Sequence, residues 1–192
     1  MTKFPETFYY NIFAIPFLHI KVTDWEHKKE ILLNLCSKET LTFEKVSTVK
    51  NSFSIDESNS YELSNKIEEI LKDELDCFRN NFNIKESEII QSWFQVEDRG
   101  MYHPIHNHGY GHFSSVCFIE FDENKHTPTH FVSPAPDVVS GDIMKFIPDN
   151  ISEGSIIFFP SGLPHYSPGN TTDIPRRILS FNIAPREYLT HS

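Results

Sequence analysis

The chain has few cysteines and few basic residues, and each scarcity excludes a class of protein. Its 192 residues include only three cysteines, Cys36, Cys77 and Cys117, and none of them has CxxC spacing. We therefore expect buried thiols in a reducing cytosol rather than a disulfide framework. Seventeen basic residues stand against 27 acidic ones, the net charge is −10, and no basic run exceeds two residues. This balance disfavours nucleic acid and anionic membranes as partners on electrostatic grounds.

Long hydrophobic runs are also missing. No stretch of about 18 apolar residues is present to span a membrane. Residues 1–20 lack a cationic start followed by a clean apolar run, and Pro5 and Pro16 interrupt them, so we do not expect a signal peptide. These features predict a soluble, cytoplasmic protein.

Apolar and aromatic residues are abundant enough for one core. Hydrophobic residues make up 39% of the chain, aromatic residues 14%, and 17 residues are phenylalanine. The length and this composition predict a single domain over residues 1–192.

The first 87 residues have the pattern of a supporting region rich in helix. Residues 8–22 predict one or two short strands, and Thr23 with Glu26 forms a possible capping box before a helix. Apolar residues then recur at helical spacing over residues 61–82, which predicts one long amphipathic helix.

From residue 88 onward the apolar pattern has period two. The expected strands are residues 89–98, 113–122, 126–134, 142–148, 154–161 and 176–184. Short strands at this spacing predict an antiparallel sandwich or barrel. With helices first and strands later, the fold class is α+β.

Histidines are concentrated in one segment, RGMYHPIHNHGYGHF at residues 99–113. His106 and His108 have i, i+2 spacing, which on a strand turns both imidazoles to one face and toward one metal ion. His165, far downstream in FFPSGLPHYSPGN, is the candidate third ligand on a neighbouring strand. Three protein ligands that leave positions open are typical of catalytic metal sites.

The two histidine segments resemble the paired motifs of the cupin superfamily. Gly100 precedes His106 and His108, and Gly154 precedes the Pro-x-Gly turn and His165. The resemblance implies a double-stranded β-helix, or jelly roll, that binds metal in its interior. The chain departs from the cupin pattern where a glutamate is usual, because His112 follows instead of a carboxylate.

The C-terminal segment FFPSGLPHYSPGN…RRILSFNIAP resembles the end of the 2-oxoglutarate/Fe(II)-dependent oxygenases related to the prolyl 4-hydroxylase superfamily. IFAIPF, the SWFQV strand and HNHG followed by SSVCFIEFD are similar as well, so the resemblance covers most of the chain. The short length is similar to that of members carried by phages, which implies the host cytoplasm as the location. The resemblance implies a jelly-roll core over residues 88–192, Fe(II) and 2-oxoglutarate as cofactors, and oxidation by dioxygen with hydroxylation as the commonest outcome.

The resemblance also implies roles for single residues. His106 matches the first metal ligand, His108 the position of the family's carboxylate, and His165 the distal ligand. Arg176 matches the arginine that binds 2-oxoglutarate, and a guanidinium can hold a carboxylate by two parallel hydrogen bonds. Arg177 is the alternative, and strand alternation predicts that one of the two points inward and the other to solvent.

Other residues have weaker claims to the site. His103 or His112 are alternative metal ligands, since both lie in the same segment as the HxH pair. The remaining candidates, as groups that bind the co-substrate or line the cavity, are Tyr102, Tyr110, Ser115, Asn182, Trp93 and Gln95.

Two further functions fit the same pattern. A third imidazole in place of a carboxylate still favours Fe(II), Ni, Cu or Zn over Mg, so one alternative is a three-histidine metalloenzyme of cupin type that does not use 2-oxoglutarate. The other is a jelly-roll binding module without catalysis. For the enzyme we expect a small-molecule or peptidyl substrate.

Overall fold

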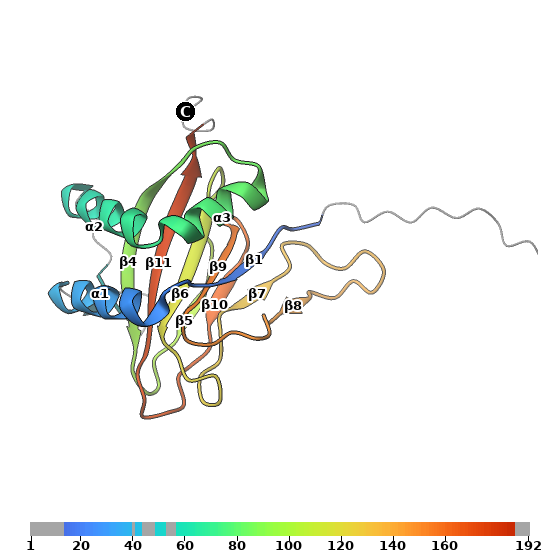
Figure 1. The fold of residues 1–192 in the computed structure, drawn as a ribbon. Helices are drawn as coiled ribbons and strands as arrows, with labels where there is room; N and C mark the ends of the chain where they lie inside the picture. The colour runs from blue at the N-terminus through green and yellow to red at the C-terminus, as the bar shows by residue number, and fades with distance from the viewer. Residues whose placement is uncertain (1–13, 40, 44–48, 53–56, 187–192) are drawn as a thin grey trace, which may run out of the picture.

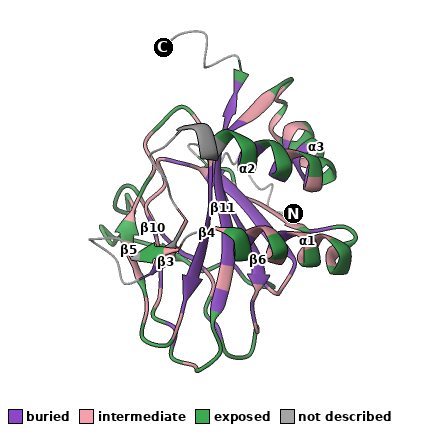
Figure 2. Cartoon of the chain, turned by 90° about the vertical axis from the view of Figure 1, so that its left-hand side faces the viewer, coloured by how far each residue is buried: buried purple, intermediate pink, exposed green. Residues whose placement is uncertain are grey.

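Two antiparallel β-sheets pack face to face, and three helices cover the outer face of the larger sheet (Figures 1 and 2). The structure is a computed structural model that describes residues 14–39, 41–43, 49–52 and 57–186. The part of the expected 8–22 strand that precedes residue 14 lies outside the described residues. None of the described helices is long and apolar enough to cross a membrane.

The larger sheet has seven strands in the order β1-β9-β6-β11-β4-β3-β2. Its strands are β1 (Leu18–Lys21), β2 (Thr42–Phe43), β3 (Lys50–Asn51), β4 (Ser87–Glu97), β6 (Phe113–Glu120), β9 (Ser155–Pro160) and β11 (Arg176–Pro185). The smaller sheet has four strands in the order β5-β10-β7-β8. They are β5 (His103–His106), β7 (His130–Val132), β8 (Lys145–Phe146) and β10 (His165–Ser167). The helices are α1 (Trp25–Lys38), α2 (Glu57–Ile70) and α3 (Lys72–Phe82). This arrangement confirms the predicted α+β jelly roll.

Strand alternation divides the core into two layers. In β11, Leu179 and Phe181 belong to the cluster packed under the helices, whereas Ile178 belongs to the cluster between the sheets. In β9, Phe158 and Phe159 divide in the same way. Successive side chains of a strand point to opposite faces, so the central strands are buried on both sides and the inner face of the larger sheet is available to form a site.

The helices differ from the sequence prediction at two points. The expected helix over 61–82 is wrong as a single element, because α2 begins at Glu57 and the chain breaks at Leu71 before α3. Leu71 is fully buried with backbone angles outside the helical range, so the apolar stripe continues through the break. The capping box before α1 is also wrong: the N-cap is Asp24, and the Thr23 hydroxyl instead donates a hydrogen bond to Glu74 of α3.

The strand predictions for residues 126–134 and 142–148 are too long. The structure reduces them to β7 and β8, and an irregular segment with exposed apolar side chains connects the two. The histidine spacing predicted that His106 and His165 lie on strands but gave no bounds for them, and the structure supplies these strands as β5 and β10. Strands from the first 87 residues also extend the larger sheet at both of its edges.

Candidate metal centre and its cavity

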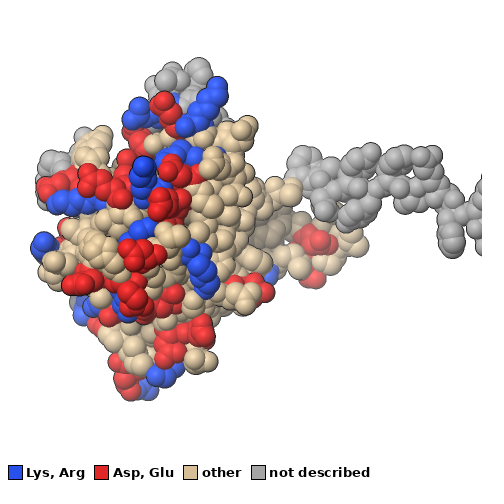
Figure 3. Space-filling view, viewed as in Figure 1, with Lys and Arg blue, Asp and Glu red and all other residues tan. Residues whose placement is uncertain are grey.

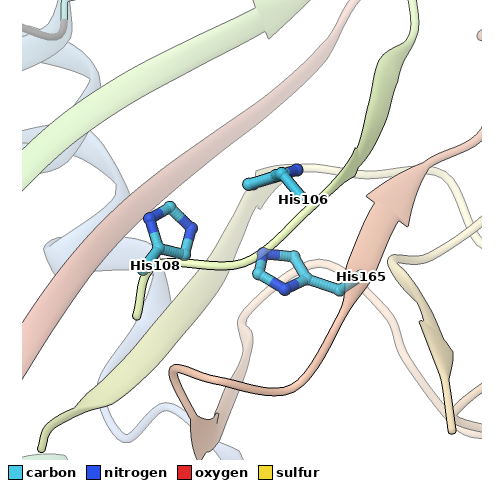
Figure 4. A group of neighbouring side chains, drawn as sticks. All are labelled: His106, His108 and His165. Carbon is cyan, nitrogen blue, oxygen red and sulfur yellow. The ribbon is translucent and has the colours of Figure 1, made fainter. Parts of the chain in front are cut away.

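His106, His108 and His165 converge at one end of the smaller sheet (Figure 4). Each offers a ring nitrogen, and these three atoms lie within 4.8 Å of one another. His106 is the last residue of β5 and lies opposite His165 of β10 in the strand register. Their ring centroids are 4.3 Å apart.

His108 reaches the cluster by a different route from the one its spacing predicts. The strand ends at His106, so the two histidines of the HxH pair do not share a regular strand. The backbone N–H of His108 donates to the carbonyl of Ser161, 2.9 Å away, just after β9. The His108 ring then lies 5.0 Å from that of His106 and 5.2 Å from that of His165, measured between centroids.

Backbone carbonyls orient two of the rings. Nδ1 of His106 lies 2.8 Å from the carbonyl oxygen of Pro104, and Nδ1 of His165 lies 2.9 Å from that of Leu163. A carbonyl oxygen only accepts, so in each ring Nδ1 carries the proton and Nε2 keeps its lone pair. Such second hydrogen bonds are the usual way in which metal-binding histidines are held.

Burial keeps the imidazoles neutral. It lowers the pKa of His108 to about 4, with positive charge on neighbouring histidines as a smaller cause. It lowers the pKa of His165 to about 3, and the neighbouring histidines again add to the effect. Metal ligands must be deprotonated, so both rings are in the binding form at neutral pH.

The donor set fits a transition-metal ion. Within the described part of the chain the cluster contains imidazoles alone, without a carboxylate. Imidazole suits Fe, Ni, Cu and Zn, whereas Mg and Ca prefer oxygen ligands. The three histidines are therefore suited to hold Fe(II), and they differ from the two-histidine, one-carboxylate triad.

A small cavity adjoins the histidines. Its volume is about 30 Å³, against roughly 300–1,000 Å³ for pockets that enclose drug-sized ligands. Organic reactants must therefore displace side chains or extend into solvent. Besides the three histidines, its wall is formed by Trp93, Gln95, His103, Ser114, Ser115, Val116, Thr129, Phe159, Tyr166, Ser167, Ile178 and Ser180.

Ser115 is the wall residue whose polar group is least satisfied. The residue is 1% exposed, and its hydroxyl has no hydrogen-bond partner among the described residues. The neighbouring Ser114 hydroxyl, by contrast, bonds to both Ser161 and Asn182. Ser115 lies opposite Phe158 of β9 and Phe181 of β11, which belong to the cluster under the helices, so its hydroxyl points to the helix side of the sheet and away from the cavity.

Residues 91–182 match the family model described as "Putative 2OG-Fe(II) oxygenase". The matched segment, which contains His106, His108 and His165, belongs to this family. The match identifies the protein as an enzyme of the oxygenase class, with Fe(II) and 2-oxoglutarate as its cofactors.

Solved structures share the fold of this oxygenase. HygX from Streptomyces hygroscopicus, with nickel, 2-oxoglutarate and hygromycin B bound, aligns with a TM-score of 0.63 at 10% identity, over 89% of this chain and 83% of that one. A prolyl-4-hydroxylase from Pseudomonas putida aligns with a TM-score of 0.57 at 12% identity, over 90% and 94%. The viral collagen prolyl hydroxylase of Paramecium bursaria Chlorella virus-1, in complex with 2-oxoglutarate, aligns with a TM-score of 0.55 at 13% identity, over 87% and 94%. No curated protein matches the chain.

The two arginines of the oxygenase point to opposite sides, as alternation predicts. Arg176 is 2% exposed on the inner face of the larger sheet, with its guanidinium 5.5 Å from the Phe118 ring. Arg177 is half-buried on the other side and pairs with Glu120. Of the two, only Arg176 lies near the cavity, through its hydrogen bonds to the wall residues Ser167 and Thr129.

The weaker candidates of the oxygenase divide into two groups. Trp93, Gln95 and Ser115 line the cavity, as does His103, whose ring centroid lies 4.0 Å from that of His106. The structure does not place Tyr102, Tyr110, His112 or Asn182 in the wall.

The second group has other contacts. Asn182 bonds to Ser114 and Gln91 beneath the cavity, and Nδ1 of His112 lies 3.2 Å from the carbonyl of Tyr110. Tyr110 is 88% exposed, yet its ring lies so close to Gly162 that an added Cβ there would stand 2.7 Å from it.

Sequence reasoning missed Glu97, the counter-ion of Arg176. The two charged atoms are 2.8 Å apart, and both side chains are almost fully buried. The signal was present, because Trp93, Gln95 and Glu97 alternate along β4 and so share a face. A buried carboxylate on the cavity side of a strand almost always has a partner.

Proposed function

We propose that the protein is an Fe(II)- and 2-oxoglutarate-dependent hydroxylase whose metal is held by His106, His108 and His165. The observation that carries this proposal is the convergence of three imidazoles beside a partly polar cavity, in a chain that matches the 2OG-Fe(II) oxygenase family. When bound, Fe(II) and 2-oxoglutarate supply the oxidation of a C–H bond by dioxygen, with succinate and carbon dioxide as the co-products.

The side chains of this site have separable roles. The three histidines hold the metal through nitrogens whose tautomers are set by the backbone. Trp93 packs over His108, and Phe159 packs against His165, at centroid distances of 5.4 and 4.8 Å. These rings exclude water from one side of the cluster, which strengthens electrostatic interactions within it.

The substrate in this proposal is a small molecule or a peptidyl side chain that presents a C–H bond at the mouth of the cavity. Among the similar structures, one carries hygromycin B and another is a prolyl-4-hydroxylase, so the fold admits both kinds. Three free cysteines, two of them buried, support a reducing compartment such as the cytoplasm.

A second candidate is a three-histidine oxygenase that does not use 2-oxoglutarate. It is favoured by the imidazole-only donor set and by the salt bridge that already occupies Arg176. The two candidates differ in whether 2-oxoglutarate is converted to succinate in step with oxygen consumption.

Anaerobic titration tests the leading proposal. Fe(II) is added to the purified protein, followed by 2-oxoglutarate, and the visible charge-transfer band of the chelate is recorded. We expect one Fe(II) per chain and a band that saturates. Replacing His106, His108 or His165 by Ala should weaken metal binding more than loss of a supporting hydrogen bond does, which costs about 10–100-fold.

The matched control is His27→Ala, a change at an exposed histidine of α1, which should leave the titration unchanged. Bound iron without a band would favour the second candidate. A protein that binds no metal, or a His106→Ala variant that binds it normally, would exclude both.

A further inference from the structure

We propose that Glu97 sets the co-substrate preference of the enzyme by holding the positive charge of Arg176 inside the protein. The inference rests on the proposed function, because it concerns the acid that binds beside the metal. While the Glu97–Arg176 ion pair is intact, the cavity wall that faces the co-substrate carries no net charge. A second carboxylate on the co-substrate therefore gains little binding energy from Arg176.

Arg176 and Glu97 form one unit of the fold. They are direct partners in the register between β11 and β4, and each is almost fully buried, at 2% and 1% exposure. An Nη1 hydrogen of Arg176 is donated to Oε2 of Glu97, 2.8 Å away. Because the two residues face each other on paired strands, the backbone hydrogen bonds between the strands fix their positions. The ion pair therefore does not depend on the conformation of a loop.

Both oxygens of Glu97 have further donors. Oε1 accepts from Nε2 of Gln95 at 2.6 Å, and Oε2 accepts from the Ser167 hydroxyl at 2.8 Å. Arg176 in turn donates to Ser167 and to the Thr129 hydroxyl. A buried carboxylate with this many charge-assisted bonds is costly to remove from its place.

The network lies directly behind the cavity wall. Gln95, Thr129 and Ser167 line the cavity; Gln95 bonds to Glu97, Thr129 bonds to Arg176, and Ser167 bonds to both members of the charged pair. An entering ligand therefore meets an amide and two hydroxyls instead of a free guanidinium.

The charge balance of the site points the same way. In a metal triad of two histidines and one carboxylate, the negative charge of the carboxylate lies directly at the metal ion. Here the three ligands are neutral, and the carboxylate stands beside the arginine instead. The net charge is the same in both arrangements, but the positive charge is concentrated at the metal end. This distribution attracts the keto acid end of a co-substrate and gives a distal carboxylate little additional attraction.

The test compares two acids of equal chain length, 2-oxoglutarate and 2-oxopentanoate, which has a methyl group in place of the distal carboxylate. Their dissociation constants are measured on the Fe(II)-loaded protein without oxygen. We expect the two constants to agree within about threefold for the wild type. In Glu97→Gln the freed Arg176 should tighten 2-oxoglutarate binding by about 10- to 100-fold, as expected for a charge-assisted hydrogen bond, and leave 2-oxopentanoate unchanged.

A double variant keeps the test decisive if Glu97→Gln fails to fold with an unpaired buried arginine. Glu97→Gln combined with Arg176→Gln removes both charges, and we expect the wild-type preference to be retained. A wild type that prefers 2-oxoglutarate by more than about tenfold, together with a double variant that has lost this preference, would overturn the inference.

A metal-free arm separates the inference from the proposed function. Glutarate, a dicarboxylate without the keto group, is titrated into metal-free protein and followed by ligand-observed NMR. We expect binding to Glu97→Gln and none to the wild type or the double variant. Equal binding to wild type and Glu97→Gln overturns the role of Glu97 even if metal binds normally, whereas failure to bind metal overturns the proposed function alone.

Discussion

His106 and His165 lie opposite each other across the β5–β10 pair, although they are far apart in the chain. Both rings are held by a backbone carbonyl two residues before them, so the two ligands have the same local geometry on paired strands. Among the residues that the structure describes, His108 has no such carbonyl contact, and its backbone N–H donates to the carbonyl of Ser161. The cluster thus combines two ligands set by a strand pair with a third set by the loop that follows.

The neighbouring serines Ser114 and Ser115 should respond in opposite ways to removal of the hydroxyl. Ser114→Ala loses two buried hydrogen bonds, and we expect the free energy of unfolding to fall by about 1–3 kcal/mol. Ser115→Ala removes a hydroxyl without a protein partner, so stability should stay the same or rise slightly. Urea denaturation of both variants measures this. Equal destabilisation of the two variants would contradict the two hydrogen bonds assigned to the Ser114 hydroxyl.

A carboxylate at position 108 should make stability depend on metal. In the metal-free protein His108→Asp places an unpaired charge in the half-buried cluster, and a bound cation would neutralise it. We expect the variant to lose about 1–3 kcal/mol without metal and to gain more from Fe(II) than the wild type does. Thermal unfolding with and without anaerobic Fe(II) measures the difference. The control is His108→Asn, which is similar in shape and neutral, and identical behaviour of the two variants would argue against a metal at this position.

The contact between α1 and α3 should weaken in acid. Glu74 is 1% exposed and accepts hydrogen bonds from Lys28 and from the backbone and hydroxyl of Thr23. Burial acts to raise the pKa of Glu74, but these bonds outweigh it and the pKa lies below its ordinary value of 4.5. A carboxyl with a lowered pKa stabilises the fold above its ordinary pKa, and this contribution is lost as the pH falls through the lowered value.

Glu74→Gln should therefore cost about 3 kcal/mol near neutral pH, where it leaves Lys28 without its partner, and progressively less as the pH falls through the lowered pKa of Glu74, where the carboxyl itself becomes protonated. Urea denaturation of wild type and variant over a series of pH values measures the change. Glu62→Gln, at an exposed pair with Lys66, is the control and should have little effect. A Glu74→Gln cost that is independent of pH would contradict this account.

Gly154 should tolerate no side chain. Its φ is +76°, and an added Cβ would stand 2.9 Å from the Trp25 ring of α1. Left-handed strain costs about 1–2 kcal/mol, and the clash adds to it, so we expect Gly154→Ala to lose about 2–4 kcal/mol. Gly111→Ala is the control for strain alone, since φ is +89° and no atom lies within 4 Å of its Cβ position. Denaturation curves that coincide for the two variants would show that Trp25 does not pack as described.

The sequence alone determined the features that depend on neighbours in the chain. The alternation of apolar residues after residue 88 is a property of extended backbone, so it predicted the central strands and the opposite directions of Arg176 and Arg177. Residue type and spacing can be read directly from the sequence, so the HxH pair and the later histidine also predicted a cluster of three imidazoles.

Only the tertiary structure decided which residues meet across strands. The pairing of Glu97 with Arg176 depends on the register of β4 and β11, and a shift of one residue would turn either side chain to the other face. The break at Leu71 and the contact of Thr23 with Glu74 likewise depend on packing between elements. These contacts form between residues remote in sequence, and packing of the whole chain selects them, so the local pattern of β4 indicates that Glu97 faces inward but not that its partner is Arg176.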